Sequence, residues 1–320
     1  MTLKDFYGAV IETGIENDLR GKEEIVKLLA EEKARFEKLD EKDKGFFDRD
    51  RLFNPFSDTR ILHGEGELKL GKAIIGIDME VGEVLLAYLL NKDLERKIDL
   101  VIAHHPEGPA LVRLFDVMNL QSDMMAAYGI TLSVAEKLME KRIGEVERRL
   151  MPVNHNRTVD VARLLGLPMI CIHTAADNCV TRFLSRLFEK ETPARLRDIL
   201  ELLRDIPEYR RSAAAQLPPR IVSGSEDSRC GKILVDMTGG TEGAKDVFEK
   251  YAAGGVSTLV GMHISEDHLE NAKKANLNIV IAGHISSDTL GLNLLLDSVE
   301  KKGRLEYVCV SGFERIRREA

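Results

Sequence analysis

The sequence is poor in cysteine, in long apolar runs and in excess positive charge. Its four cysteines lie far apart without a C-x-x-C pair, which argues against a disulfide-bonded scaffold and favours reduced thiols in the cytoplasm. No apolar run approaches the roughly 18 residues of a membrane helix, and the first residues lack the apolar core of a secretory signal. Lys and Arg number 46 against 53 Asp and Glu, a net charge of −7, which argues against a surface that coats nucleic acid. We therefore expect a cytoplasmic protein without a nucleic-acid or membrane partner.

What is present is the composition of a globular chain, with 44% hydrophobic and 31% charged residues over 320 positions. Residues 2–18 and 21–39 have apolar residues at helical spacing among many charges, which predicts two amphipathic surface helices. Further on, short β-branched runs alternate with helical stretches, as in βαβ units around largely parallel sheets. The predicted division is a helical N-terminal arm (1–70), a first α/β half (71–185), a helical connector (186–230) and a second α/β half (231–320).

Histidines stand where apolar runs end. Four predicted strands are followed by His104 and His105, by His173, by His263 and by His284. Ligands of open α/β sheets bind at the carboxyl ends of strands, so these side chains are expected to converge on one crevice.

Carboxylates follow two of these histidines at the same spacing. Asp177 comes four residues after His173, and Asp288 comes four residues after His284. Mixed imidazole and carboxylate ligands suit zinc, manganese or iron. The alternative for each acid is capping of a helix N-terminus, but the shared spacing after separate strands favours the metal interpretation.

The dipeptide His104-His105 adds a further constraint. Neighbours on an extended strand point in opposite directions, so both can bind one centre only where the backbone turns, and Pro106 and Gly108 supply that turn. With two aspartates and a further histidine, the set exceeds the needs of one tetrahedral ion and suits two divalent ions.

Three motifs resemble the Nif-three-like family (NGG-one-interacting factor three), whose bacterial members are often labelled GTP cyclohydrolase one type two homologues. They are D-L-V-I-A-H-H-P (Asp99 to Pro106), H-T-x-x-D (His173 to Asp177) and A-G-H-x-x-S/T-acid-x-x-G (Ala282 to Gly291). Their order and the surrounding βα pattern match from about residue 55 to the C-terminus.

The resemblance implies two βαβ-type halves that share a metal-site crevice and a homo-oligomer, often a ring-like hexamer. It implies that the metal ligands are His104, His105, Asp177, His284 and Asp288, with His173 close to the site. Two features depart from the family. Asp288 stands where glutamate is usual, and it is shorter by one methylene, about 1.5 Å of reach. The N-terminal arm lies outside the resemblance.

These observations favour a metal-dependent hydrolase that acts on a nucleotide or other phosphorylated small molecule. Glu107, just after the histidine pair, is a candidate general base, although a solvated loop acid is the alternative. The glycine turn at Gly239-Gly240 could receive phosphate on its backbone N–H groups or be a plain tight turn. A non-catalytic metal-binding regulatory or chaperone protein is the alternative function, and a scaffold whose metals only hold the fold is a third.

Overall fold

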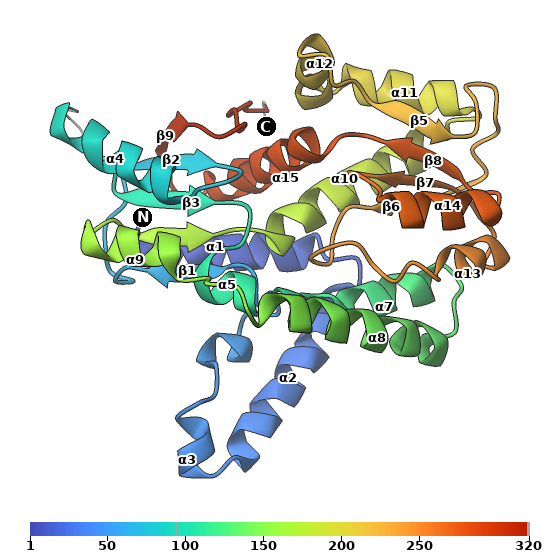
Figure 1. The fold of residues 1–320 in the computed structure, drawn as a ribbon. Coiled ribbons are helices and arrows are strands. Elements are labelled where there is room, and N and C mark those ends of the chain that lie inside the picture. The colour runs from blue at the N-terminus through green and yellow to red at the C-terminus, as the bar shows by residue number, and fades with distance from the viewer. Residues whose placement is uncertain (94, 96, 319–320) are drawn as a thin grey trace.

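Two β-sheets with helices packed around them form the structure, a computed structural model that describes residues 1–93, 95 and 97–318 (Figure 1). The strands are β1 (Arg60–His63), β2 (Lys72–Gly76), β3 (Leu100–Ala103), β4 (Met169–Cys171), β5 (Arg220–Ser223), β6 (Lys232–Asp236), β7 (Val256–Gly261), β8 (Asn278–Ile281) and β9 (Glu306–Cys309). The helices are α1 (Leu3–Glu16), α2 (Lys22–Lys38), α3 (Glu41–Lys44), the 3-10 helix η1 (Arg49–Leu52), α4 (Val81–Asp93), α5 (Gly108–Val112), α6 (Leu114–Val117), α7 (Asn119–Ala127), α8 (Leu132–Leu150), α9 (Arg157–Leu164), α10 (Thr174–Glu191), α11 (Leu196–Asp205), α12 (Pro207–Ala214), α13 (Phe248–Ala253), α14 (Glu266–Lys274) and α15 (His284–Val299). The predicted α/β class is confirmed.

The two sheets repeat one topology. The first has the order β1-β4-β3-β2-β9 and the second has the order β5-β8-β7-β6. In each, the first strand pairs antiparallel with the fourth, while the second, third and fourth strands are parallel. A long helix follows each fourth strand, and these two helices, α10 and α15, pack against each other between the sheets (Figure 1). The carboxyl ends of equivalent strands therefore face one region from both halves.

Three strands cross the predicted division of the chain. β1 comes from the segment expected to be a helical arm and joins the first sheet, and β5 comes from the expected connector and joins the second. β9, near the C-terminus, returns to the first sheet and pairs in parallel with β2. α10 continues without a break through the expected boundary at residue 185. The two halves are thus interleaved along the chain, which a linear change in composition does not reveal.

The N-terminal arm is shorter than expected. α1 is not a surface helix, because Leu3, Phe6 and Val10 have no exposed surface and belong to the core with residues of α10 and α15. Within this segment, α2 and α3 extend away from the rest of the molecule (Figure 1). Ile25 is the one buried side chain of α2, so this segment has almost no core of its own.

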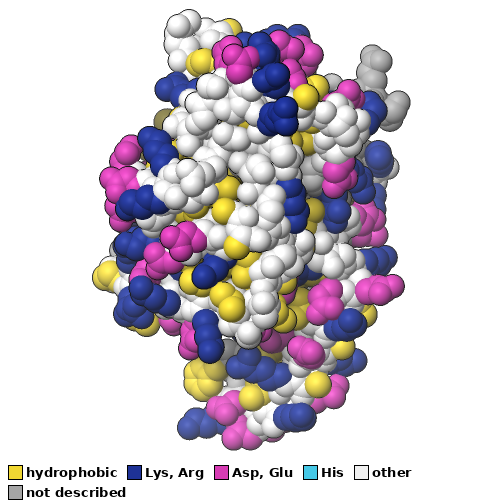
Figure 2. Space-filling view, turned by 90° about the vertical axis from the view of Figure 1, so that its right-hand side faces the viewer, with side chains coloured by type: hydrophobic (Ala, Val, Ile, Leu, Met, Phe, Trp, Pro, Cys, Tyr) yellow, Lys and Arg dark blue, Asp and Glu magenta, His cyan; other side chains and the backbone are white. Residues whose placement is uncertain are grey.

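The surface and the helices agree with the composition. Acidic and basic side chains are interspersed over the face in Figure 2, which has no large area of one sign. Among the residues that the structure describes, no helix combines the length and the apolar character needed to cross a membrane.

The contact between α10 and α15 gives a test of the fold. A Cβ on Gly291 of α15 would lie 2.6 Å from the carbonyl oxygen of Ala176 in α10. We expect Gly291→Ala to lower the free energy of unfolding by about 1–3 kcal/mol, because the helices must separate to accept the methyl group. Gly8 of α1 has no atom within 4 Å of such a Cβ. Gly8→Ala is the control and should raise stability by up to about 1 kcal/mol. Urea unfolding measures both, and equal effects would contradict the close packing.

Candidate metal centre

The predicted ligands come from strand ends and helix starts of both halves. His104 and His105 follow β3 directly, and His173 lies between β4 and α10. Asp177 lies in the first turn of α10, and His284 begins α15. Because α10 and α15 pack together, the helix starts bring their acids to the end of β3. Asp288 is thus carried from the second sheet to the histidine pair of the first.

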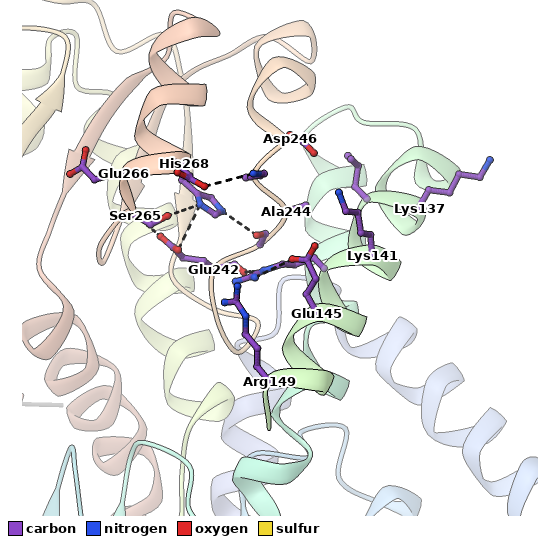
Figure 3. A pocket seen from close by; sticks show the side chains of 15 residues that line it. Lys137, Lys141, Glu145, Arg149, Glu242, Ala244, Asp246, Ser265, Glu266 and His268 are labelled. Carbon is purple, nitrogen blue, oxygen red and sulfur yellow. Dashed lines mark hydrogen bonds and ion pairs between the residues drawn. The ribbon is translucent and has the colours of Figure 1, made fainter. Parts of the chain in front are cut away.

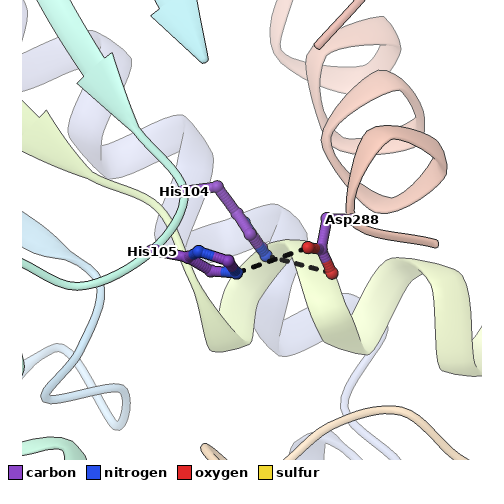
Figure 4. A group of neighbouring side chains, drawn as sticks. All are labelled: His104, His105 and Asp288. Carbon is purple, nitrogen blue, oxygen red and sulfur yellow. Dashed lines mark ion pairs between the residues drawn. The ribbon is translucent and has the colours of Figure 1, made fainter. Parts of the chain in front are cut away.

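The side chains converge around His104 and Asp288. Nε2 of His104 lies 3.4 Å from Oδ1 of Asp177 and 3.5 Å from Oδ1 of Asp288. Oδ2 of Asp288 lies 3.4 Å from Nε2 of His105 and 3.5 Å from Nε2 of His284. Figure 4 shows His104 and His105 pointing at the Asp288 carboxylate. The structure therefore brings together all five residues that the sequence proposes as ligands.

His173 is also part of this centre. Its Nε2 lies 3.8 Å from Oδ2 of Asp177. Its ligand atoms, with those of His104 and Asp177, lie within 4.8 Å of one another, and so do those of His104, His105 and Asp288. The two groups share His104, and either group has the donor types that bind a divalent transition metal.

Several atoms of the centre are buried without a hydrogen-bond partner. They are Nε2 of His104, Oδ1 of Asp177 and both carboxylate oxygens of Asp288. Buried polar atoms are nearly always paired in folded proteins, and an unpaired buried carboxylate is costly. A cation among these atoms would satisfy all of them, so the residues present fit a metal site.

The second ring nitrogens of His104 and His105, the Nδ1 atoms, lie within hydrogen-bond distance of oxygen atoms. Nδ1 of His104 lies 2.8 Å from the backbone oxygen of Ile172, and Nδ1 of His105 lies 2.6 Å from Oδ1 of Asp78. Nδ1 therefore carries the proton, and Nε2 offers its lone pair to the centre. Carboxylates and carbonyls behind metal-binding histidines act in this way.

Asp58 orients the ring of His173 in the way that Asp78 orients the ring of His105. This carboxylate has no exposed surface, and its Oδ2 lies 2.8 Å from Nδ1 of His173 and accepts from Oγ1 of Thr174 at 2.6 Å. The sequence reasoning missed both supporting acids. Asp78 follows the end of β2 and could have been found as another acid after a strand, but Asp58 lies in a loop with no such signal.

The two aspartates differ in their protonation. Burial by itself raises the pKa of a carboxyl group, but at Asp288 the imidazoles of His104 and His105 outweigh it and hold the pKa well below its usual range. At Asp177 burial prevails over His173 and raises the pKa to about 6. Burial lowers the pKa of His173, but Asp177 and Asp58 outweigh it and raise that pKa to about 9. Asp288 is therefore the fixed anion of the centre.

The second half supplies the opposite wall of a cavity of about 80 Å³ at this centre, lined by Asp236, Glu242 and His263 among others. His263 follows β7, at the position equivalent to the histidine pair after β3, and its ring centroid lies 4.9 Å from that of His284. Oε1 of Glu242 lies 3.6 Å from Nδ1 of His263. Burial raises the pKa of Glu242, but His263 and the backbone N–H of Ser265 outweigh it and lower that pKa to about 2.

Glu107, the residue proposed as a general base, does not line this cavity. It is the residue before α5, and its carboxylate interacts with Thr158. Burial raises its pKa above the ordinary value. The catalytic role of Glu107 stays a prediction, while His263 lines the cavity together with His284 and Asp288.

Asp58 gives a test of how the centre is held. Asp58→Asn should weaken metal binding about 10- to 100-fold, the usual effect of losing an acid that orients a ligand histidine. Asp160→Asn is the matched control, because Asp160 is an exposed acid that pairs with Arg163 on the surface. Competition with a chelator measures the affinity. Equal affinities for the two variants would mean that His173 takes no part in binding.

The comparisons with known proteins agree with the motifs. No protein-family model and no curated protein matches the sequence. A solved structure described as a NIF3 superfamily protein from Sphaerobacter thermophilus is 30% identical, with a TM-score of 0.71, and the match covers 80% of this chain and 92% of that one.

Two further structures are more distant. Reduced HcgD from Methanocaldococcus jannaschii is 15% identical with a TM-score of 0.49, over 78% of this chain and 88% of that chain. A Bacillus cereus protein related to NIF3 is 12% identical with a TM-score of 0.38, over 79% and 90%. On its likeness to the Sphaerobacter protein, in sequence and in fold over most of both chains, this chain belongs to the NIF3 superfamily.

Proposed function

We propose that the chain is a metal-dependent hydrolase that acts on a nucleotide or another phosphorylated small molecule. The observation that carries the proposal is the set of buried, unpaired atoms of His104, Asp177 and Asp288, of which the two aspartates line a cavity. Groups of this kind raise the energy of the folded chain unless a cation binds them, and their position at a cavity gives a substrate access to that cation.

We propose two divalent ions, held by His104, His105, Asp177, His284 and Asp288. Support comes from the number of donors, since two overlapping groups of ligand atoms exceed what one tetrahedral ion requires. His104 lies between the two aspartates, with both acids at nearly equal distances from Nε2. The metal is zinc, manganese or iron, the ions that accept this mixture of imidazole and carboxylate.

Divalent ions in such a site lower the pKa of bound water toward 7 and polarise the bond to be cleaved. The residues of the chain have other roles. Asp58 and Asp78 hold the Nδ1 atoms of His173 and His105 and thereby orient both rings, so that Nε2 is the ring nitrogen left for the centre. His263, held by Glu242 on the opposite wall, is the group placed to accept a proton inside the cavity.

A non-catalytic metal-binding regulatory or chaperone protein is the second candidate. The small volume of the cavity at the centre, about 80 Å³, favours it, because that volume alone is below the usual range for ligand pockets. Tight, stoichiometric metal without turnover would identify this function. The homo-oligomer stays a prediction.

Metal content and turnover test the proposal together. Protein purified under metal-replete conditions should contain about two ions per chain, and His105→Ala should lose most of them. His155→Ala, outside the centre, is the control. A panel of phosphoesters and nucleotides should show turnover that rises with metal and falls in His105→Ala. Trace metal in the wild type would contradict the site, and full occupancy with no turnover would contradict the hydrolase.

Asp288 separates a metal ligand from a helix cap. Asp288→Asn should weaken metal binding, because a neutral amide lacks the charge that holds a divalent ion. Asn and Asp cap helices about equally well, so a capping role predicts no change. Asp288→Glu restores the residue usual in the family. It should raise occupancy of the second ion if the carboxylate bridges two ions and lower it if the site is fitted to Asp. Elemental analysis with competitive chelation of all three proteins gives the result, and three identical affinities would contradict a ligand role.

A further inference from the structure

A larger cavity lies directly behind Glu242. Its volume is about 560 Å³, which is within the range of small-molecule sites. One wall is the helix α8, and the other is the segment 242–246 with the start of α14. Glu242 lines this cavity and also the cavity at the metal centre, so the two spaces meet at one side chain. Figure 3 shows Lys141, Glu145 and Arg149 on successive turns of α8, on the side toward Glu242 and His268.

The α8 wall has cations without carboxylate partners. Arg142 pairs with Glu145, but no ion pair joins Lys137, Lys141 or Arg149 to any acid in the part of the chain that the structure describes. Lys137 and Lys141 are four residues apart on one helix face, where like charges repel and destabilise the helix. Lys137, Lys141 and Arg149 therefore present three positive charges to the cavity, a set that suits an anion.

The opposite wall contains acids, and two of them have no ion-pair partner among the described residues. Asp267 pairs with Lys245, and Glu242 is engaged by Ser265 and the neighbouring histidines. Asp246 and Glu266 have no ion pair among the described residues and face the same cavity. Carboxylates accept hydrogen bonds from hydroxyl groups, as they do from ribose in nucleotide sites. One wall therefore suits an anion, and the other suits a molecule rich in hydroxyl groups.

We propose that this cavity binds a phosphorylated polyol, with its phosphate on Lys137, Lys141 and Arg149 and its hydroxyl groups toward Asp246 and Glu266. The assignment of this ligand as the substrate rests on the proposed function. It requires that the part of the ligand that reacts extends past Glu242 to the metal centre. The binding itself depends only on the cavity. The small cavity at the metal centre would then be one end of a longer binding site, the end at which the reaction takes place.

Calorimetry with three probes tests the proposal on metal-loaded protein. Ribose 5-phosphate should bind in the millimolar range or tighter, inorganic phosphate more weakly, and ribose too weakly to detect. Lys141→Gln and Arg149→Gln should each weaken binding of ribose 5-phosphate about fivefold, since each removes a charge-assisted contact. Arg148→Gln is the matched control, because Arg148 is the neighbouring arginine of α8 and does not line the cavity. Asp246→Asn should weaken ribose 5-phosphate and leave inorganic phosphate unchanged.

A metal-depleted protein separates this proposal from the proposed function. His105→Ala should keep most of the affinity for ribose 5-phosphate and its sensitivity to Arg149→Gln, because the cavity has no metal ligand of the centre among its lining residues. In the metal-loaded wild type, binding of ribose 5-phosphate together with no turnover across the substrate panel would contradict the hydrolase but support the cavity. Absence of binding in the wild type would overturn the cavity proposal, and so would loss of binding only in His105→Ala or equal effects of Arg148→Gln and Arg149→Gln.

Discussion

The centre depends on one packing contact, the close approach of the first turn of α10 to the third turn of α15. Gly291 lies against the backbone of Ala176, so the two helices meet without a side chain between them. Each helix follows the fourth strand of its sheet, and each has an aspartate in its early turns. Close packing of these helices brings Asp177 and Asp288 to opposite sides of His104. A repeated topology has thereby produced a pair of acids that neither half contains alone.

That geometry would stabilise a bound cation at the expense of the metal-free fold. Asp177 and Asp288 are 5% and 1% exposed, and three of their four carboxylate oxygens lack a hydrogen-bond partner. Burial of charge without a partner is unfavourable by several kcal/mol in real proteins. At Asp177 the neighbouring imidazoles do not offset it, since burial raises the pKa of that carboxyl group to about 6. An ion that binds the folded chain and not the unfolded one adds its binding free energy to stability. Metal content and stability are therefore expected to vary together in this chain.

The sequence was sufficient to find the residues that converge at the candidate centre, because strand periodicity and strand ends are local signals. His104, His105 and His284 could be found as polar residues that end apolar runs, and Asp177 and Asp288 by their spacing. Asp58 could not, because its contact with His173 spans 115 residues and depends on β1 pairing with β4. The burial of α1 was missed for a similar reason. Its charges favour a surface position, and only the packing of α10 and α15 creates the apolar surface that covers it.

The segment 237–243 connects the metal centre with the larger cavity, and its position is fixed from both sides. Gly239 and Gly240 have positive φ, and Nε2 of Gln121 donates to the backbone oxygens of Gly239 and Thr241. At its start, Oγ1 of Thr238 donates to Oδ1 of Asn178 at 2.7 Å. Asn178 is fully buried and directly follows Asp177, so one turn of α10 holds both a candidate ligand and the wall that leads to Glu242. A shift of that turn would act on the metal centre through Asp177 and on its boundary with the second cavity through the hydrogen bond of Asn178 with Thr238.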